Sequence, residues 1–444
     1  MLQTKAMEQR VGSPSPSRQS NVYNYYVVIV LTLVYLCSSL DRMIVSTVAE
    51  PLKHEFSLSD TQLGVLTGLF FAISFGVCGV PLGMLADRVH RPRLLSALLT
   101  VWSCLTFMSS FAQSYAMLAL ARIGVGASES GASSTSMSII SDLFPPEKRG
   151  LALSFFYAST PIGISIGLAL GGYIAGHYGW RSVFMVAGIP GILLALLLLF
   201  TVRNPARGQF DSGAEKQKHA GEPVTVGTGF RLLWKMPALL MIMAAGVCLI
   251  VAQAGTHAFL TPFLMRVHHI TIAEAGFATG LAQFIPGITG VLLGGVLADR
   301  MARRSSYAGL FAVAGLMLVT GPSSMAAFLV NDWHHAMVLL AVHNFLLALY
   351  YGTHFSSLLS LTPFRFRGTI GGIHAVALTL MGYGVGPVVA GAASDFFQNI
   401  GLEEPLRWAE VAVSGMFLVA AVFYLAAATL VRRGKLAEAR RTLS

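Results

Sequence analysis

Four ionisable residues lie inside stretches that are otherwise apolar enough to cross a membrane, and they are the first place where this sequence could do chemistry. Asp41 and Arg42 are adjacent in one stretch, and Arg122 and Glu129 share another. A charged side chain at the centre of a bilayer costs about 2.5–3.5 kcal/mol on insertion scales, so such residues are functional by default. Protonation of either carboxylate would unbalance a set that is otherwise neutral. We therefore expect Asp41 and Glu129 to be proton acceptors.

The spacing of these residues predicts how they face one another. Arg122 and Glu129 are seven residues apart, about two helical turns, and so share one face of a helix. A rise of about 1.5 Å per residue places Asp41 and Arg122 at matching depth, where they could pair. Arg42 or Arg122 could also hold a phosphate or carboxylate of a substrate. The alternative is that the four residues only fix the packing of two helices.

Composition identifies the elements that must position these residues. The 444-residue chain is 55% hydrophobic and 11% charged, with a mean hydropathy of +0.67, whereas about a quarter of the residues of a soluble domain are charged. About 20 apolar residues cross a bilayer as a helix. The sequence predicts twelve such spans, at 24–49, 62–85, 94–112, 115–141, 151–175, 183–202, 236–260, 276–298, 306–330, 336–361, 369–393 and 410–431.

The spans divide into two groups of six. A polar linker over 203–235, which shows no helical apolar periodicity, separates a six-helix bundle over 23–202 from a second one over 236–431. Tails over 1–22 and 432–444 complete the chain, and the first tail is polar, so we expect no cleavable signal before the first span. The predicted fold class is an all-α membrane protein with 12 transmembrane helices in two pseudo-symmetric bundles.

Positive charge predicts the orientation in the bilayer. With the N-terminus inside, 24 of the 30 Lys and Arg fall in cytoplasmic segments, as the positive-inside rule requires. Both termini are then cytoplasmic, and the expected partner of the net charge of +10 is the lipid bilayer rather than a nucleic acid.

An internal repeat links the two predicted bundles. The segment Gly83–Arg91 recurs as Gly295–Arg303, 212 residues later, and Pro146–Gly150 is echoed by Phe364–Gly368. Such landmarks indicate parallel repeats around a central pathway. We expect the repeated charges to form a gate at the cytoplasmic face by stabilising the state that is closed inside; these residues are Asp87, Arg88, Arg91, Asp299, Arg300 and Arg303.

The segment Gly83–Arg91, with its weaker copy half a chain later, resembles the signature of the major facilitator superfamily. A narrower resemblance, to the Spinster family, rests on Leu40-Asp41-Arg42 together with the run from Arg122 through Gly124, Gly126, Glu129 and Gly131 to Pro145. The resemblance implies a bacterial, inner-membrane, proton-coupled transporter that works by alternating access. Its implied substrate is amphipathic, of the lysophospholipid or sphingoid phosphate type.

Further polar and aromatic residues in the spans could line a central cavity. An amphipathic substrate needs apolar walls with a few polar groups, although each such residue could equally be packed or hydrogen-bonded between helices. The candidates are Phe70, Phe71, Tyr157, Gln253, Gln283, His343 and Asn344. Neither a metal site nor a cofactor is expected, because the four cysteines lie in apolar stretches without CxxC spacing.

Three other functions compete with this hypothesis. The string Gly163–Gly167 matches the G-x-S-x-G of hydrolases, but that motif needs a strand-to-helix elbow and here lies in a predicted span, so we expect no enzyme. A proton-coupled carrier of small organic anions or drugs is the main alternative. A membrane sensor that does not transport is a weaker one. A monomer would suffice for any of these functions.

Overall fold

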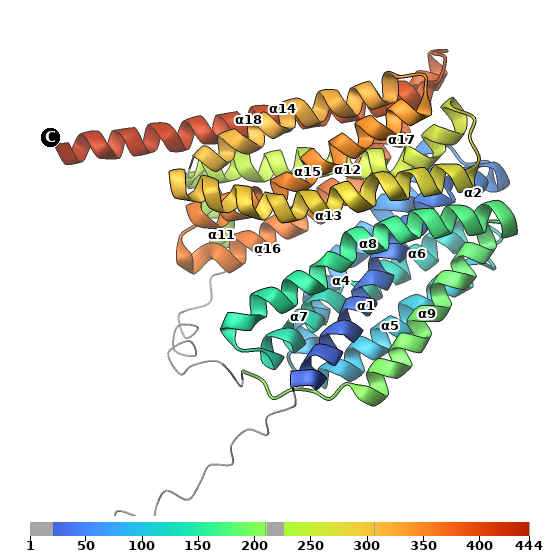
Figure 1. The fold of residues 1–444 in the computed structure, drawn as a ribbon, viewed down its shortest axis with the longest axis horizontal. Coiled ribbons are helices and arrows are strands. Elements are labelled where there is room, and N and C mark those ends of the chain that lie inside the picture. The colour runs from blue at the N-terminus through green and yellow to red at the C-terminus, as the bar shows by residue number, and fades with distance from the viewer. Residues whose placement is uncertain (1–20, 209, 211–225, 306, 444) are drawn as a thin grey trace, which may run out of the picture.

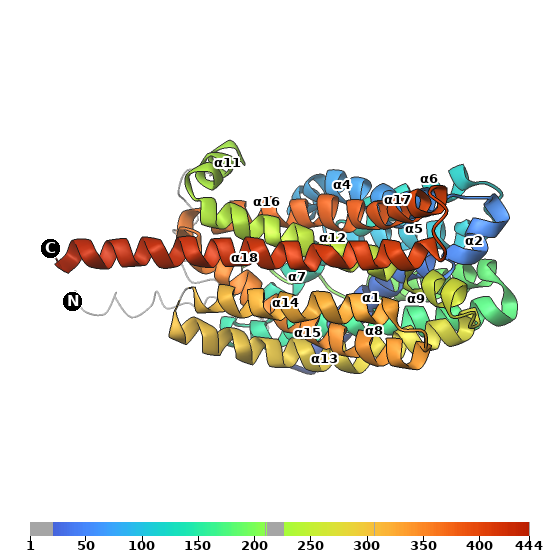
Figure 2. The same cartoon turned by 90° about the horizontal axis from the view of Figure 1, so that it is seen from above.

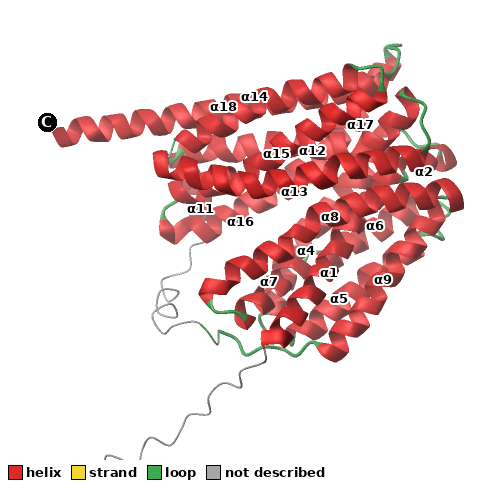
Figure 3. Cartoon of the chain, viewed as in Figure 1, coloured by secondary structure: helices red, strands yellow, loops and turns green. Residues whose placement is uncertain are grey.

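A computed structural model describes residues 21–208, 210, 226–305 and 307–443. Every regular element in those ranges is a helix (Figure 3). Ten helical segments are long and apolar enough to cross a membrane. The predicted N-terminal tail up to residue 20, the middle of the predicted linker and the last residue of the C-terminal tail lie outside the described ranges.

The first group of helices runs from α1 to α9. Its members are α1 (Asn21–Thr47), α2 (Ala49–Phe56), α3 (Asp60–Gly64), η1 (Val65–Leu69), α4 (Phe70–Ala86), α5 (Arg91–Ser109), α6 (Tyr115–Glu129), α7 (Ala132–Leu143), α8 (Pro146–Tyr178) and α9 (Trp180–Thr201). The predicted third and fourth spans are not among the ten apolar segments. They are helices all the same: α5 starts at two arginines, and a turn at Ser130 and Gly131 divides α6 from α7.

The second group of helices follows the linker. Its members are α12 (Pro237–Val267), α13 (Ile272–Arg304), α14 (Ala308–Leu329), α15 (Trp333–Leu361), η2 (Phe364–Phe366), α16 (Arg367–Ala377), η3 (Leu378–Gly384), α17 (Val385–Asn399) and α18 (Pro405–Leu443). Side-chain caps begin one helix in each group. Ser59 with Gln62 caps α3, and Thr271 with Glu274 caps α13, which satisfies amide groups that would otherwise lack partners.

The expectation that the linker lacks helical periodicity is wrong over its last ten residues. Helix α11 (Val226–Lys235) forms there, and it lies beside α16 (Figure 2). Leu233 is buried in the core of the second group, whereas Trp234 next to it is 80% exposed. The helix is therefore amphipathic, and its short apolar face was too brief to stand out in a polar segment.

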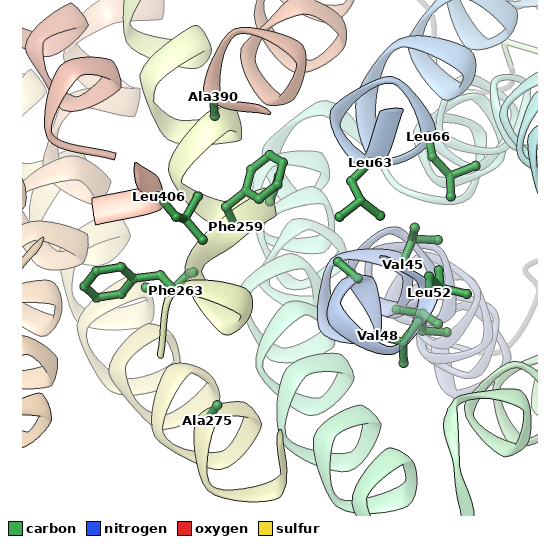
Figure 4. Close-up of a cluster of buried hydrophobic side chains, with 14 of the residues drawn as sticks. Val45, Val48, Leu52, Leu63, Leu66, Phe259, Phe263, Ala275, Ala390 and Leu406 are labelled. Carbon is green, nitrogen blue, oxygen red and sulfur yellow. The ribbon is translucent and has the colours of Figure 1, made fainter. Parts of the chain in front are cut away.

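The hydrophobic cores show how the two groups meet. Val27–Val34 of α1 belong to a core built by the first group alone, and Leu239–Ala252 of α12 belong to one built by the second group alone. The later parts of the same helices, Ile44 with Val45 and Ala258–Val267, enter a third cluster that both groups share. Figure 4 shows that shared cluster, with Leu63 on one side and Phe259 and Phe263 on the other.

The chain therefore has two unlike ends. At one end, which we call the joined end, α2 and the start of α3 lie against the end of α12 and α17. At the other, the terminal end, α1 begins and α18 ends, and the ribbons of the two groups diverge (Figure 1). Each group keeps its own core at the terminal end, so the halves can separate there without breaking a shared core.

Candidate functional site

Glu129 and Arg42 form an ion pair at the centre of the first group. The Arg42 Nε and Nη2 atoms each lie 2.6 Å from Glu129 Oε1, and the Ser38 hydroxyl donates to the same oxygen. The Glu129 side chain is fully buried, whereas that of Arg42 is 33% exposed. Glu129 is the last residue of α6, before the turn that leads into α7. Arg42 thus bridges a buried carboxylate and an accessible space.

Asp41 directly precedes Arg42 on α1 and has a partner of its own. The Thr106 hydroxyl on α5 donates to Asp41 Oδ1 at 2.9 Å. Asp41 Oδ2 and Glu129 Oε2 are both buried without a hydrogen-bond partner in the described chain. A buried polar oxygen without a hydrogen bond costs free energy, so neither carboxyl group is fully satisfied by the described chain.

The expected Asp41–Arg122 pair is wrong for this conformation. Within the described residues no carboxylate lies within 4 Å of Arg122, which is 5% exposed. Its guanidinium instead stacks on the Phe71 ring, 5.1 Å from the centroid, and Arg42 lies 5.5 Å from the same ring. Such contacts favour a cation by about 0.5–2 kcal/mol. The similar depth of Asp41 and Arg122 in the membrane does not bring their side chains into contact, because Phe71 lies beside Arg122.

A cavity of about 230 Å³ opens beside these arginines, between the two groups of helices. Arg42, Arg122, Phe71 and Tyr35 line it from the first group, and His257 and Tyr383 from the second. The arrangement places two cations and aromatic side chains at the wall of the cavity. The buried carboxylate of Glu129 does not line the cavity itself but binds Arg42, which does. Guanidinium groups at the wall of a cavity are chemically suited to an anionic group, and one of them, that of Arg42, already holds the Glu129 carboxylate.

Most of the other expected lining residues lie elsewhere. Of that set only Phe71 lines the cavity. The Asn344 amide donates to the Ala282 carbonyl at 3.1 Å, His343 contacts the Thr320 carbonyl at 3.2 Å, and Tyr351 donates to Gln253 at 3.2 Å. The remaining members are placed as follows: Phe70 packs on Tyr115, Tyr157 donates to Met137, and Gln283 lies near Gly287. Sequence reasoning could not separate lining from packing, because both use the same residue types.

The expected gating residues lie at the terminal end in two environments. The side chains of Asp87, Arg88, Asp299, Arg300 and Arg303 are all exposed. Arg91, in contrast, is 1% exposed, and it donates to Asp142, to Ser138 Oγ at 2.9 Å and to the Pro205 carbonyl at 2.7 Å. The exposed carboxylates hold no partner across the two halves in this conformation, as far as the described residues show.

Sequence reasoning missed a cluster of ion pairs at the joined end. Asp60 is 1% exposed and binds Lys53 Nζ at 2.6 Å from its own half. Arg266 of the other half approaches Asp60 at 2.8 and 3.0 Å and Glu50 at 2.7 Å. Asp395 accepts from the backbone amides of Asp60 and Thr61 at 3.0 and 2.9 Å. The sequence did hold one signal for this cluster: Lys53 and Arg266 are cations outside the segments that are predicted to be cytoplasmic.

These features can be compared with known proteins. Residues 31–374 match the Major Facilitator Superfamily. The chain belongs to this superfamily. It is 31% identical, over 93% of its own length and 94% of the relative's, to an MFS-type efflux pump of Mycolicibacterium smegmatis. The membership accounts for the two groups of helices, the repeated signature and the ten apolar segments, and it makes the protein an integral membrane transporter.

Within the superfamily the chain is similar to Spinster proteins. It is 28% identical over 71% of its length to Protein spinster of Drosophila melanogaster, and it spans 53% of that relative. Among solved structures it resembles a bacterial homologue of the human lysosomal transporter Spinster, described as inward-facing and unoccupied. The TM-score is 0.82 at 28% identity, with 93% of this chain and 98% of the other covered. The Spinster resemblance predicted from Asp41, Arg42, Arg122 and Glu129 is confirmed.

Proposed function

We propose that this transporter is proton-coupled, works by alternating access and carries an anionic amphipathic substrate of the lysophospholipid or sphingoid phosphate type. The observation that carries the proposal is the Arg42–Glu129 pair at the wall of the cavity. A substrate phosphate would lie against Arg42 and Arg122, and the aromatic walls would hold the apolar part. Asp41 is the second proton acceptor, held near the site by Thr106.

Coupling follows from competition for one cation. While Glu129 is ionised it occupies Arg42, and a neutral Glu129 would release Arg42 to an anionic ligand. Proton binding and substrate binding would then favour each other, and by linkage the effect is reciprocal. A hydrogen bond to a charged group is worth about 1.5–3 kcal/mol, so protonation should raise substrate affinity by about 10–100-fold.

The two ends supply the alternating gate in this proposal. The ion pairs of Asp60 and Arg266 close the joined end here, and the repeated motifs would close the terminal end in the other state. With both termini cytoplasmic and the protein in a bacterial inner membrane, as we propose, this conformation would be the inward-facing state. A monomer contains all of these parts.

The test is proton flux into proteoliposomes under an imposed pH gradient. Wild type, Glu129→Gln and the control Glu403→Gln, an exposed residue, are compared with and without lysophosphatidylglycerol. We expect lipid-dependent flux in wild type and in the control, and a loss of at least about tenfold in Glu129→Gln. Unchanged flux in Glu129→Gln would refute the role of this residue.

A binding measurement separates coupling from folding. Glu129→Gln cannot compete for Arg42 as a carboxylate, so it should bind lysophosphatidylglycerol with the high affinity that wild type reaches only at low pH, and without pH dependence. A variant that folds but binds no lipid, or binds it with the pH dependence of wild type, contradicts the exchange at Arg42.

A small organic anion is the second candidate substrate. The cavity of about 230 Å³ is smaller than the usual pockets for drug-sized ligands, about 300–1,000 Å³, and two arginines suit a dicarboxylate. A relative from Bacillus subtilis, 26% identical over 67% of this chain, is called a probable galactarate/D-glucarate transporter. Competition of dicarboxylates against lysophosphatidylglycerol in the flux assay decides between the two.

A further inference from the structure

A pocket in the second group of helices corresponds, through the internal repeat, to the site of the Arg91–Asp142 ion pair in the first group. The second group has no carboxylate at the position that matches Asp142. The pocket has a volume of about 310 Å³ and lies at the terminal end, among the end of α13, the start of α14 and the last turns of α15. Arg303, Arg304, Thr353, Ser356 and Ser360 are among its lining residues. It is separate from the central cavity, with which it shares no lining residue.

The internal repeat identifies the matching residues. The offset of 212 that relates Gly83–Arg91 to Gly295–Arg303 matches Arg91 with Arg303 and Pro92 with Arg304. The motif Arg149-Gly150 recurs as Arg367-Gly368, 218 residues later. That second offset matches three polar residues of the first group with three that line the pocket, namely Thr135 with Thr353, Ser138 with Ser356, and Asp142 with Ser360.

In the first group the arginine is satisfied internally. Arg91 donates to Asp142 and to Ser138 Oγ at 2.9 Å, and the amide of Gly208 donates to the other Asp142 oxygen at 2.9 Å. The charge of Arg91 is thus neutralised by a residue of the same half, and the side chain is 1% exposed. An ion pair of this kind needs no outside ligand.

In the second group the same position lacks its anion. By the offset of 218, Ser360 takes the place of Asp142, and its hydroxyl donates to the Ser357 carbonyl at 3.0 Å. Arg304 adds a second cation. Among the described residues neither Arg303 nor Arg304 forms an ion pair, not even with Asp299, which lies one turn before Arg303. Thr353 is 2% exposed, and its hydroxyl has no hydrogen-bond partner in the described chain.

We propose that this pocket binds a phosphate-type anion in the place that Asp142 occupies in the first group. Two guanidinium groups, with the hydroxyls of Ser356 and Ser357 that also line the pocket, provide planar and single donors for phosphate oxygens. Complementing the dipole at the end of α13 would explain arginines there, but it would not explain a threonine that lines the same pocket with its hydroxyl buried and without a partner in the described chain. The anion is either the headgroup of an anionic phospholipid or free phosphate; basic pockets near a membrane surface attract both.

The decisive variant restores the missing carboxylate. Ser360→Asp should pair with Arg303, raise the melting temperature of the purified full-length protein without added anion, and weaken phosphate binding at least tenfold. Ser360→Asn has nearly the same size without the charge, so it should keep wild-type binding. Equal anion-dependent stabilisation in wild type and Ser360→Asp would overturn the proposal.

A second pair of variants tests the cations. Arg303→Gln with Arg304→Gln should abolish the stabilisation, whereas Arg432→Gln with Arg433→Gln removes two exposed charges at the end of α18 and should leave it unchanged. Equal losses in both double variants would mean a general charge effect and would also overturn the proposal.

The probes distinguish the two sources of the anion. Thermal unfolding is followed with inorganic phosphate against chloride at constant ionic strength, and with phosphatidylglycerol against phosphatidylcholine. Stabilisation by phosphate identifies a free anion, and stabilisation only by phosphatidylglycerol identifies a lipid headgroup. If neither probe stabilises wild type, the pocket does not bind anions. None of these outcomes depends on the transported substrate.

Discussion

At the joined end Asp60 is held by Lys53 of its own half and by Arg266 of the other, with a shared hydrophobic cluster beneath. At the terminal end Asp87 and Asp299 are exposed, and each half keeps a separate core. The same kinds of charged residue therefore do different work at the two ends in this conformation. In the alternating-access cycle that we propose, the contacts of the joined end would break and new contacts would form at the terminal end.

Removal of the Asp60 carboxylate should have the largest effect on this difference. Breaking a buried ion pair by removing one partner costs about 3–5 kcal/mol. Asp60→Asn removes the carboxylate that both Lys53 and Arg266 bind. We expect a lower melting temperature and a longer distance between spin labels at Gln113 and Leu402, both exposed at the joined end, in a background without the four native cysteines.

The matching change at the terminal end serves as its control. Asp299→Asn alters an exposed side chain, so it should change the stability of this state by less than about 0.5 kcal/mol. If Asp299→Asn lengthens the label distance as much as Asp60→Asn does, the two ends do not differ as described.

A methyl group added where two helices of different halves pack closely should have the second largest effect. A Cβ atom added at Gly391 would overlap the backbone of Asp60 in the other half, whereas one added at Gly295 would meet nothing within 4 Å. Gly391→Ala should disfavour the joined state by about 1–3 kcal/mol through overpacking, and Gly295→Ala should not. Accessibility of a cysteine at Ser46, which lines the cavity, to a thiol reagent from the joined end measures the shift.

An equal increase in labelling for Gly391→Ala and Gly295→Ala would contradict this interpretation. It would indicate that both glycines act through helix propensity rather than through contact between the halves.

An exposed pair at the joined end should give the smallest effect, and one that depends on pH. Arg181 binds Glu55 at 2.6 and 2.9 Å and holds the pKa of that carboxyl below its usual value. Because the pKa of Glu55 is lower in the folded state, the pair stabilises the protein at pH values above the unfolded-state pKa of about 4.3. That stabilisation is lost as the pH falls through the lower pKa of the folded state. The pair is partly exposed, 41% and 38%, so the contribution is small.

Comparison of the melting temperatures of wild type and Glu55→Gln at pH 7 and pH 3.5 measures that contribution. The two proteins should differ at pH 7, and the difference should be smaller at pH 3.5. A difference that persists in acid would show that Glu55 acts through packing.

Hydrophobic segments and repeated motifs predicted most of the fold, because bilayer thickness fixes the length of a span. The predicted spans fall on helices throughout, and α5 and α6 were found although their arginines lower their hydropathy. Helix α11 was missed because its apolar face covers fewer than three turns. The ionisable residues of α1 and α6 were found by their cost in a membrane.

The pairing within the site could not be predicted. Depth along a helix places Asp41 and Arg122 in one layer, but rotation about each helix axis decides which side chains meet, and that depends on contacts such as Ser74 with Gly126. The cluster around Asp60 joins residues more than 200 positions apart. Nothing in local spacing relates them, so only the assembled halves reveal it.

The hydrophobic cluster shared at the joined end also has a thermal consequence. Each opening of that end must expose side chains such as Phe259, Phe263 and Leu63. Exposure of apolar surface raises the heat capacity, so the equilibrium between the two states should follow a curve in temperature rather than a straight van 't Hoff line. Cooling weakens the hydrophobic contribution, and the fraction of molecules open at the joined end should therefore increase in the cold.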